Sequence, residues 1–276
     1  MSLAMAQPDQ EADRYTRSSI LRSERMYGEG FQSPGNIAAV ASFCARLEMK
    51  PRMRILDIGS GLGGSAFYLA DRYGARVVGL DVAPAMVELS TERTQERNLS
   101  TVVFRLGDIR SYPLAADAFD LVWTRDAILY VPEKRMVWRK VFNSLKPGGQ
   151  LFITDFCRRR GDLSGDFSAY LEQCHYHLQD IGEYTDTLHQ AGFEIATAED
   201  VTSEFIDSLE KEREQLIRHK AEFLADFDEA DYRYLVERWE MKTRFCRQGD
   251  LRWGLFVARK PLSNPASTVA SRETRS

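Results

Sequence analysis

Apolar and polar positions alternate in a regular order between residues 54 and 156. Short apolar runs predict strands at residues 54–58, 75–81, 101–106, 119–123 and 150–155. Amphipathic segments between these runs predict helices at residues 64–73, 84–97 and 132–145. Strands that alternate with helices in this way build a mostly parallel sheet with helices on both faces. We therefore expect an α/β fold with a doubly wound sheet.

The order of elements changes after residue 156. We expect helices at residues 166–179 and 180–191, a strand at 192–198, and two long charged helices at 202–225 and 228–246. An apolar strand at 251–259 then closes a sheet of seven strands. The long helices thus form an insertion before the last strand, and insertions of this kind commonly build substrate pockets.

The chain before the first strand is predicted to be helical. A polar run and a short amphipathic segment occupy residues 9–33, and Pro34 starts a second helix. The first segment fits either a helical collar on the core or a lid, because Gly28 and Gly30 flank a stretch with several aromatic side chains. The expected organisation is an N-terminal helical lid at 9–47, a core at 48–201 and 250–260, a helical insertion at 202–249, and a disordered tail at 261–276.

Composition excludes several classes of function. The 276 residues carry a formal net charge of -4, which gives no electrostatic footprint for nucleic acid. No apolar run is long enough to span a membrane, and the N-terminus has no signal-peptide pattern. Four widely spaced cysteines indicate reduced thiols rather than a disulfide frame or a metal site. We expect a cytoplasmic protein without metal, present as a monomer or a weak homo-oligomer.

A glycine-rich turn follows the first predicted strand. The segment Asp57-Ile-Gly-Ser-Gly-Leu-Gly-Gly64 fits the dinucleotide pattern, with Asp81 as a partner for a ribose. Asp57 argues against a dinucleotide, because a carboxylate beside the glycines repels a pyrophosphate and attracts an ammonium group. Asp108, after the third strand, suits an adenine amino group. An ammonium, a ribose and an adenine without phosphate describe S-adenosylmethionine, whose sulfonium also favours a site lined by carboxylates.

Residues 54–156 resemble a class I S-adenosylmethionine-dependent methyltransferase with a Rossmann-like sheet. The resemblance rests on Leu56-Asp-Ile-Gly-Ser-Gly61, Asp81, Gly107-Asp-Ile109, Phe119-Asp-Leu121 and Leu145-Lys-Pro-Gly-Gly149. The chain is most similar to the phosphoethanolamine N-methyltransferase branch over residues 15–259. Motifs of that branch occur at Arg22–Phe31, Thr124–Leu129, Ile153–Cys157 and Arg252–Ala258. The resemblance implies cofactor contacts from Ser33, Asp57, Gly59, Gly61, Asp81, Val82, Asp108, Ile109 and Arg125.

The same resemblance implies which residues contact the methyl acceptor. In the branch, a tyrosine that matches Tyr15 pairs with a histidine to latch the site and to handle the amine proton, but the histidine position is Tyr130 here. The branch's Asp-Tyr-Cys is Asp-Phe156-Cys here, which removes a hydroxyl. Asp126 remains and can orient an amine.

The branch's phosphate contacts are only partly kept. They match Tyr170, Tyr176 and Lys242, whereas an arginine of the branch is Cys174. Loss of that arginine removes a bidentate donor, so a phosphate monoester is expected to bind about 10- to 100-fold more weakly unless another arginine, such as Arg158 or Arg159, reaches in.

The resulting hypothesis is N-methylation of a small amine related to phosphoethanolamine, with an altered acceptor pocket. Tyr130, Phe156 and Cys174 also keep open O-, C- or S-methylation of another metabolite. A cofactor-binding protein that has lost catalysis is the alternative from another class, and a nicotinamide oxidoreductase is the alternative for the glycine turn.

Overall fold

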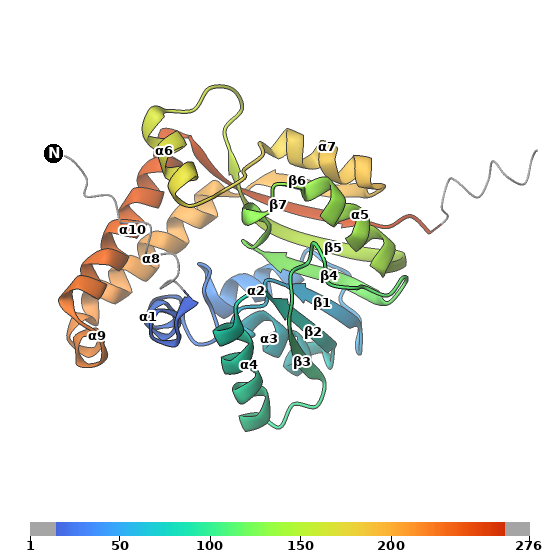
Figure 1. Cartoon of the computed structure of the whole chain (residues 1–276), viewed down its shortest axis with the longest axis horizontal. Coiled ribbons are helices and arrows are strands. Elements are labelled where there is room, and N and C mark those ends of the chain that lie inside the picture. Colours follow the sequence, from blue (N-terminus) through green and yellow to red (C-terminus); the bar gives the residue numbers. More distant parts are fainter. Residues whose placement is uncertain (1–14, 263–276) are drawn as a thin grey trace, which may run out of the picture.

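A seven-stranded sheet forms the centre of the computed structural model, which describes residues 15–262. The strands are β1 (Arg54–Ile58), β2 (Arg76–Asp81), β3 (Val102–Leu106), β4 (Phe119–Arg125), β5 (Leu145–Arg158), β6 (Glu194–Asp200) and β7 (Leu251–Arg259). Their order is β3-β2-β1-β4-β5-β7-β6, with parallel pairing from β3 to β5 and antiparallel pairing on both sides of β7 (Figure 1). The prediction of a doubly wound sheet of seven strands is confirmed.

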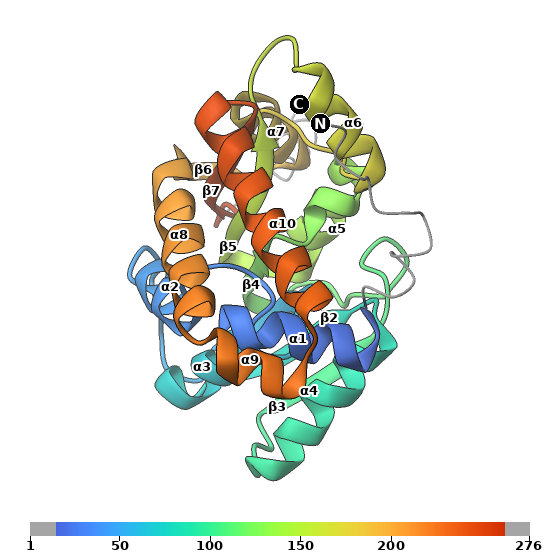
Figure 2. The same ribbon diagram turned by 90° about the vertical axis from the view of Figure 1, so that its left-hand side faces the viewer.

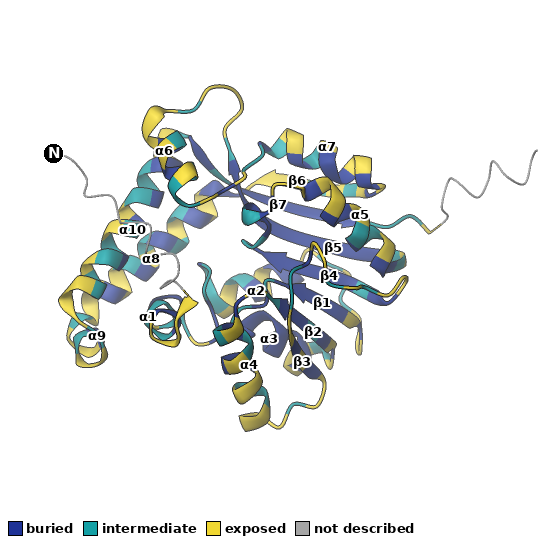
Figure 3. Ribbon diagram, viewed as in Figure 1, coloured by how far each residue is buried: buried dark blue, intermediate teal, exposed yellow. Residues whose placement is uncertain are grey.

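Helices cover both faces of this sheet. They are α1 (Arg17–Tyr27), α2 (Asn36–Cys44), α3 (Gly64–Tyr73), α4 (Pro84–Glu96), α5 (Lys134–Ser144), α6 (Gly165–Gln173), α7 (Ile181–Ala191), α8 (Thr202–Arg218), α9 (Lys220–Asp226) and α10 (Glu229–Gln248), with a 3-10 turn η3 at Ile128–Tyr130. One buried cluster joins side chains of α2, α3, α8 and α10 to the sheet, and a second joins those of α5 and α7 to it. The inner strands β1, β4, β5 and β7 are consequently buried on both faces, whereas the outer helix surfaces are exposed (Figure 3).

The sequence suggests that the last strand closes the sheet, but in the structure it does not. β7 lies between β5 and β6, and β6 forms the edge. The burial of the two strands explains their order in the sheet. β7 is buried at nearly every position, whereas the residues of β6 are exposed or half-buried. A strand that is apolar on both faces takes an inner position, and a charged strand suits an edge.

Two predicted helices are shorter than the sequence suggested. The helix predicted at 166–179 ends at Gln173, where the chain turns through Cys174 and His175, the latter with φ of 51°. The helix predicted at 202–225 is divided at His219 into α8 and α9. Both breaks matter for the site, because they change which residues share a helix face.

The insertion α8–α10 and the N-terminal helix α1 lie together at one end of the sheet (Figure 2). Ion pairs join α1 to the insertion, Arg22 with Asp231 and Arg25 with Asp226. A bidentate pair joins α1 to α4, because Arg93 Nη2 donates to Glu24 Oε2 at 2.8 Å and Nη1 lies 2.5 Å from Oε1.

Helix α1 is therefore held from two sides at the end of the sheet. Part of the expected lid, residues 9–14, lies outside the described part of the chain. So does most of the expected tail, residues 263–276. Within residues 15–262 no helix is long and apolar enough to cross a membrane.

Candidate active site

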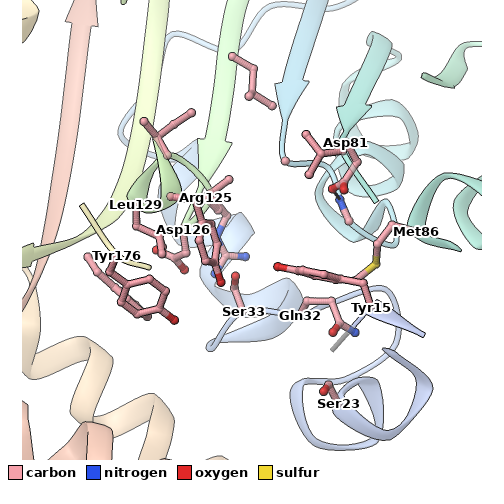
Figure 4. Close-up of a pocket in the computed structure, with 18 of the residues that line it drawn as sticks. Tyr15, Ser23, Gln32, Ser33, Asp81, Met86, Arg125, Asp126, Leu129 and Tyr176 are labelled. Atoms are coloured by element: carbon pink, nitrogen blue, oxygen red, sulfur yellow. Dashed lines mark hydrogen bonds between the residues drawn. The ribbon is translucent and has the colours of Figure 1, made fainter. Parts of the chain in front are cut away.

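A cavity of about 450 Å³ lies at the carboxyl ends of β1, β2 and β4, where parallel sheets of this kind bind ligands. The loops after these strands form its floor, and α1 and α10 contribute its roof. Figure 4 shows Asp81 and Met86 on one side of the cavity, Arg125, Asp126, Leu129 and Tyr176 on the other, and Tyr15 and Ser33 between them.

The glycine turn after β1 makes room for the floor of this cavity. Gly59 has φ of 70°, and a Cβ built on it would lie 2.2 Å from the Cβ of Ala127, so only glycine fits both the conformation and the space. Gly63 then precedes α3 in a left-handed conformation. The turn therefore brings bare backbone against the cavity, as a ligand cradle requires.

Asp81, at the end of β2, is fixed by the same turn. Its Oδ2 accepts a hydrogen bond from Gly61 N at 2.8 Å, and its Oδ1 accepts one from Ala83 N at 2.9 Å. Val82 follows on the cavity wall with 61% of its surface exposed, and Ile109 is buried across from it among the lining residues. A carboxylate beside apolar walls suits a ribose with its attached planar base.

Asp57 lies behind the cavity wall rather than in it. Its side chain is 2% exposed, and Oδ2 has no hydrogen-bond partner within residues 15–262. The pKa of Asp57 is raised to about 7, mainly by burial and in addition by the charge of Asp81, whereas Arg125 opposes the shift. The cavity therefore has an additional negative charge behind its floor whenever Asp57 is ionised, which favours a cationic ligand.

Arg125 connects β4 to the N-terminal segment. Its guanidinium is buried, stacks over Phe43 at 5.3 Å from the ring centroid, and donates from Nη2 to Pro34 O at 2.7 Å. Glu212 of α8 fixes the next residue, since its Oε1 accepts from Gly35 N at 2.7 Å. Ser33 is thereby held at the cavity by contacts from both the core and the insertion.

Stability should depend on pH through three buried acids whose pKa is raised to about 7, namely Asp57, Asp155 and Glu212. Burial raises these pKa values from ordinary values of 3.8 for the aspartates and 4.5 for Glu212, so between these limits the folded state binds more protons than the unfolded state. The free energy of unfolding therefore falls as pH rises, by up to about 1.4 kcal/mol per pH unit for each acid. Urea unfolding at about pH 5 and about pH 8 should show that Asp57→Asn or Glu212→Gln becomes more stable, relative to the wild type, at the higher pH. The exposed Glu214→Gln on the same helix is the control, and an equal pH dependence in all variants would contradict the assignment.

The acceptor side of the cavity begins at the end of β4. Asp126 lies there in a left-handed conformation with φ of 50°, and its Oδ1 accepts from Trp253 Nε1 at 2.7 Å. Three aromatic rings follow along the wall. The ring centroid of Tyr176 lies 5.2 Å from that of Tyr130 and 6.0 Å from that of Phe156. An acid and aromatic side chains thus meet at one end of the cavity.

Basic side chains of α10 and α1 line the roof. Lys242 Nζ is 5.2 Å from the ring centroid of Phe156 and 5.9 Å from that of Trp239, and only 5% of the residue is exposed. Arg238, one turn earlier on α10, donates from Nη1 to the hydroxyl of Tyr234 at 2.7 Å. Arg22 of α1 also lines the cavity. The roof therefore carries basic side chains, of which Arg22 is paired with Asp231, whereas the floor holds the carboxylates of Asp81 and Asp126 at the ends of β2 and β4.

Most residues proposed from the sequence meet in this one cavity. Those that line it are Tyr15, Ser33, Gly59, Gly61, Asp81, Val82, Asp108, Ile109, Arg125, Asp126, Tyr130, Phe156, Tyr176 and Lys242. Asp57, Tyr170 and Cys174 do not line it. Tyr170 is buried with its ring centroid 5.8 Å from that of Tyr176, and Cys174 caps the end of α6. The chain leaves α6 after Gln173 and turns at His175, so Tyr176 reaches the cavity separately from Tyr170 and Cys174.

The two arginines considered as replacements for the one lost at Cys174 do not line the cavity. Arg158 pairs with Glu183, and Arg159 approaches Asp250 at 3.5 Å, so neither reaches the cavity.

Arg22 and Arg238 line the cavity instead, and the sequence interpretation missed both of them together with Tyr234 and His175. A signal was present on α10. Residues 234, 238 and 242 follow each other at four-residue spacing and therefore lie on one helix face with the proposed Lys242.

The fold and the site define a class I S-adenosylmethionine-dependent methyltransferase. The glycine turn, Asp81 with its two backbone donors, and the apolar wall at Val82 fit S-adenosylmethionine, which is the methyl donor. The family model described as a methyltransferase domain matches residues 49–220. Phosphoethanolamine N-methyltransferase of Plasmodium falciparum is 32% identical over 253 residues, which cover 91% of this chain and 94% of that protein.

Two further relatives are similar to this chain over most of its length. Phosphoethanolamine N-methyltransferase 1 of Triticum aestivum is 38% identical over 90% of this chain and 49% of that protein, so the chain spans about half the length of this relative. A Haemonchus contortus phosphoethanolamine N-methyltransferase 2 in complex with phosphomonomethylethanolamine and S-adenosylhomocysteine superposes with a TM-score of 0.88 at 30% identity, over 94% of this chain and 61% of that one. The chain belongs to the phosphoethanolamine N-methyltransferase family. The nicotinamide alternative for the glycine turn is thereby set aside.

Proposed function

We propose that this methyltransferase transfers a methyl group to the nitrogen of a small amine related to phosphoethanolamine, in an acceptor pocket altered from that of its relatives. The observation that carries the proposal is the division of charge in one cavity. Asp126 provides a carboxylate beside the donor side, whereas Arg22, Arg238 and Lys242 provide cations at the roof. An acceptor with an amine at one end and an anionic group at the other matches both ends.

Each cofactor contact follows from the local geometry. Asp81 accepts from the ribose hydroxyls, and Val82 and Ile109 enclose the adenine between apolar walls. Asp108, whose pKa is held low by the side-chain hydrogen bond from Arg110, stays ionised and accepts from the adenine amino group. Arg125 and Ser33 lie at the opposite end of the donor half, where the amino-acid part of the cofactor is expected.

The acceptor residues align the amine and control its proton. S-adenosylmethionine, when bound, supplies an electrophilic methyl group, so the amine nitrogen must face it with a free lone pair. An alkylamine has a pKa near about 10 and must lose a proton before it can react. Asp126 orients the N–H groups, and Tyr15 and Tyr130, which both line the cavity, close it and relay the amine proton to solvent, each hydroxyl accepting one proton as it gives up its own. The aromatic walls exclude water from this step.

The altered pocket has a specific consequence for rate. Tyr130 replaces an imidazole with a phenol, which is a poorer proton acceptor at neutral pH. Phe156 removes a hydroxyl from the anion end, although Arg238 adds a guanidinium there. The kcat/KM of this enzyme for phosphoethanolamine should therefore be lower than that of the Plasmodium relative, assayed in parallel, by a factor of about ten or more. Equal efficiency would show that the substitutions leave the acceptor unchanged.

A screen with a methyl-labelled donor tests the proposed function. Ethanolamine, phosphoethanolamine, other primary amines, hydroxylated aromatics and thiols are supplied one at a time, and the labelled atom of each product is identified by NMR. We expect label on nitrogen and the highest turnover among amines that carry an anionic group. Label only on oxygen, carbon or sulfur would overturn the proposal. It would favour the second candidate function, O-, C- or S-methylation of another metabolite, which Tyr130 and Phe156 support because neither side chain is a base.

A further inference from the structure

Asp126 occupies a conformation that its surroundings must hold in place. Its φ of 50° is uncommon for a residue other than glycine, and such conformations persist when neighbouring contacts determine them. The backbone N of Asp126 donates to Thr154 O at 2.8 Å, which ties the turn after β4 to β5. This backbone contact fixes the main chain but leaves the direction of the carboxylate to its side-chain contacts.

Trp253 of β7 supplies the side-chain contact. Its Nε1 donates to Asp126 Oδ1 at 2.7 Å, which is short for a nitrogen donor and typical of a bond to a charged acceptor. The indole is 1% exposed and is wedged between Phe43 at 5.8 Å and Phe205 at 5.1 Å. Its backbone N donates to the hydroxyl of Thr202 at 2.9 Å. The donor is therefore anchored in the core and at the start of the insertion.

The second carboxylate oxygen of Asp126 is different. Oδ2 is buried and accepts no hydrogen bond from any residue within 15–262, although Asp126 lines the cavity. An ionised oxygen without a partner is costly in a buried position, and such groups usually have a functional explanation. The neighbouring charges are those of Arg125 and Asp155, and neither is hydrogen bonded to this oxygen.

We propose that Trp253 is a positioning residue that holds the Asp126 carboxylate in the direction that lets it accept an N–H of the acceptor amine. This inference rests on the proposed function, because it requires an acceptor with N–H groups. The indole bond to Oδ1 fixes the carboxylate of a residue that lines the cavity. Trp253 touches neither substrate nor donor, since it does not line the cavity.

The first test is spectroscopic and needs no turnover. The chain has four tryptophans, so a 1H–15N spectrum of the full-length protein resolves four indole N–H signals, and Trp253→Phe assigns one of them. Asp126→Asn tolerates the left-handed backbone but weakens the bond. It should shift the Trp253 signal and leave that of Trp123, whose Nε1 has no partner within residues 15–262. Addition of phosphoethanolamine to the protein loaded with S-adenosylhomocysteine should also shift the Trp253 signal. A Trp253 signal that is insensitive to Asp126→Asn would overturn the proposal.

The second test is kinetic and uses the amine with the highest turnover in the screen. Trp253→Phe should lower kcat about tenfold or more and change the affinity for S-adenosylhomocysteine less than about twofold. Trp123→Phe is the matched control, because it makes the same change in the same buried cluster without loss of a hydrogen bond, and its kcat should stay within about threefold. In an Asp126→Asn background the cost of Trp253→Phe should largely disappear. An equal loss in both tryptophan variants, or an undiminished loss in the double variant, would contradict the proposal.

Failure of the proposed function gives a different result. If the wild type methylates only phenols or thiols, the amine proposal and the role of the Asp126 carboxylate fall together. The spectrum then still decides whether Trp253 holds Asp126. If an amine is methylated but Trp253→Phe behaves like Trp123→Phe, the proposed function stands and the role of Trp253 falls.

Discussion

Replacement of Asp81 by asparagine should weaken the binding of S-adenosylhomocysteine about 100-fold. Both oxygens of Asp81 accept backbone N–H groups, from Gly61 at 2.8 Å and from Ala83 at 2.9 Å. An amide can present an oxygen to only one of them, so its NH₂ group faces a second donor and the glycine turn must shift. Hydrogen bonds to a charged group contribute about 1.5–3 kcal/mol, and loss of one such contact, at the upper end of this range, accounts for the expected change.

Calorimetric titration measures this effect directly. Asp71→Asn is the control, because Asp71 is an exposed acid on α3, the helix that follows the same glycine turn. The control should bind S-adenosylhomocysteine within about twofold of the wild type, and both variants should keep the wild-type circular dichroism spectrum. Affinity within threefold of the wild type for Asp81→Asn would show that this carboxylate does not contact the donor.

Replacement of Lys242 by methionine should lower kcat/KM for phosphoethanolamine about 100-fold and leave that for ethanolamine within about threefold. The ammonium lies at the aromatic end of the cavity, 5.2 Å from the ring centroid of Phe156, where water is excluded and an ionic hydrogen bond is strong. Only the substrate with a phosphate loses this contact. Methionine keeps the length of the side chain and packs well against Phe156 and Trp239, so the fold should be retained.

The control for this prediction is Lys211→Met on α8. Lys211 is exposed and does not line the cavity, so the same chemical change should leave both substrates unaffected. The circular dichroism spectrum of Lys242→Met should match that of the wild type, which shows that the fold is retained. An equal loss for phosphoethanolamine and ethanolamine would mean that Lys242 supports the cavity rather than the phosphate.

The sequence predicts the donor side of the site better than the acceptor side, for a physical reason. Asp57 and Asp81 lie within β1 and β2, and Gly59 directly follows β1, so a local pattern places them. The apolar run 54–58 and the glycine turn are sufficient to locate the cradle.

The acceptor side depends on distant segments. Arg22 and Arg238 reach the cavity only because α1 and α10 cross over it, and the ion pair between Arg22 and Asp231 joins residues 209 positions apart. Cys174 ends α6 instead of lying within the predicted helix. The chain turns at His175, whose positive φ has no signal in the sequence. The place of β7 inside the sheet likewise depends on its burial relative to β6, which pairing alone does not reveal.

The burial of Asp57 shows a further limit of sequence interpretation. A carboxylate beside the glycines suggests direct contact with a ligand, but the strand directs this side chain behind the cavity wall. Its effect on a ligand is therefore electrostatic and depends on its own ionisation. Burial is a tertiary property, so the pKa of about 7 could not be foreseen from the motif.

The most direct measurement of the central claim is the ratio of kcat/KM for phosphoethanolamine to that for ethanolamine in the wild-type enzyme. The division of charge between Asp126 and the basic roof predicts that both compounds are methylated on nitrogen and that the ratio is about ten or more. A ratio of about one or less would contradict the account, because the cations of α1 and α10 would then play no part in binding the acceptor.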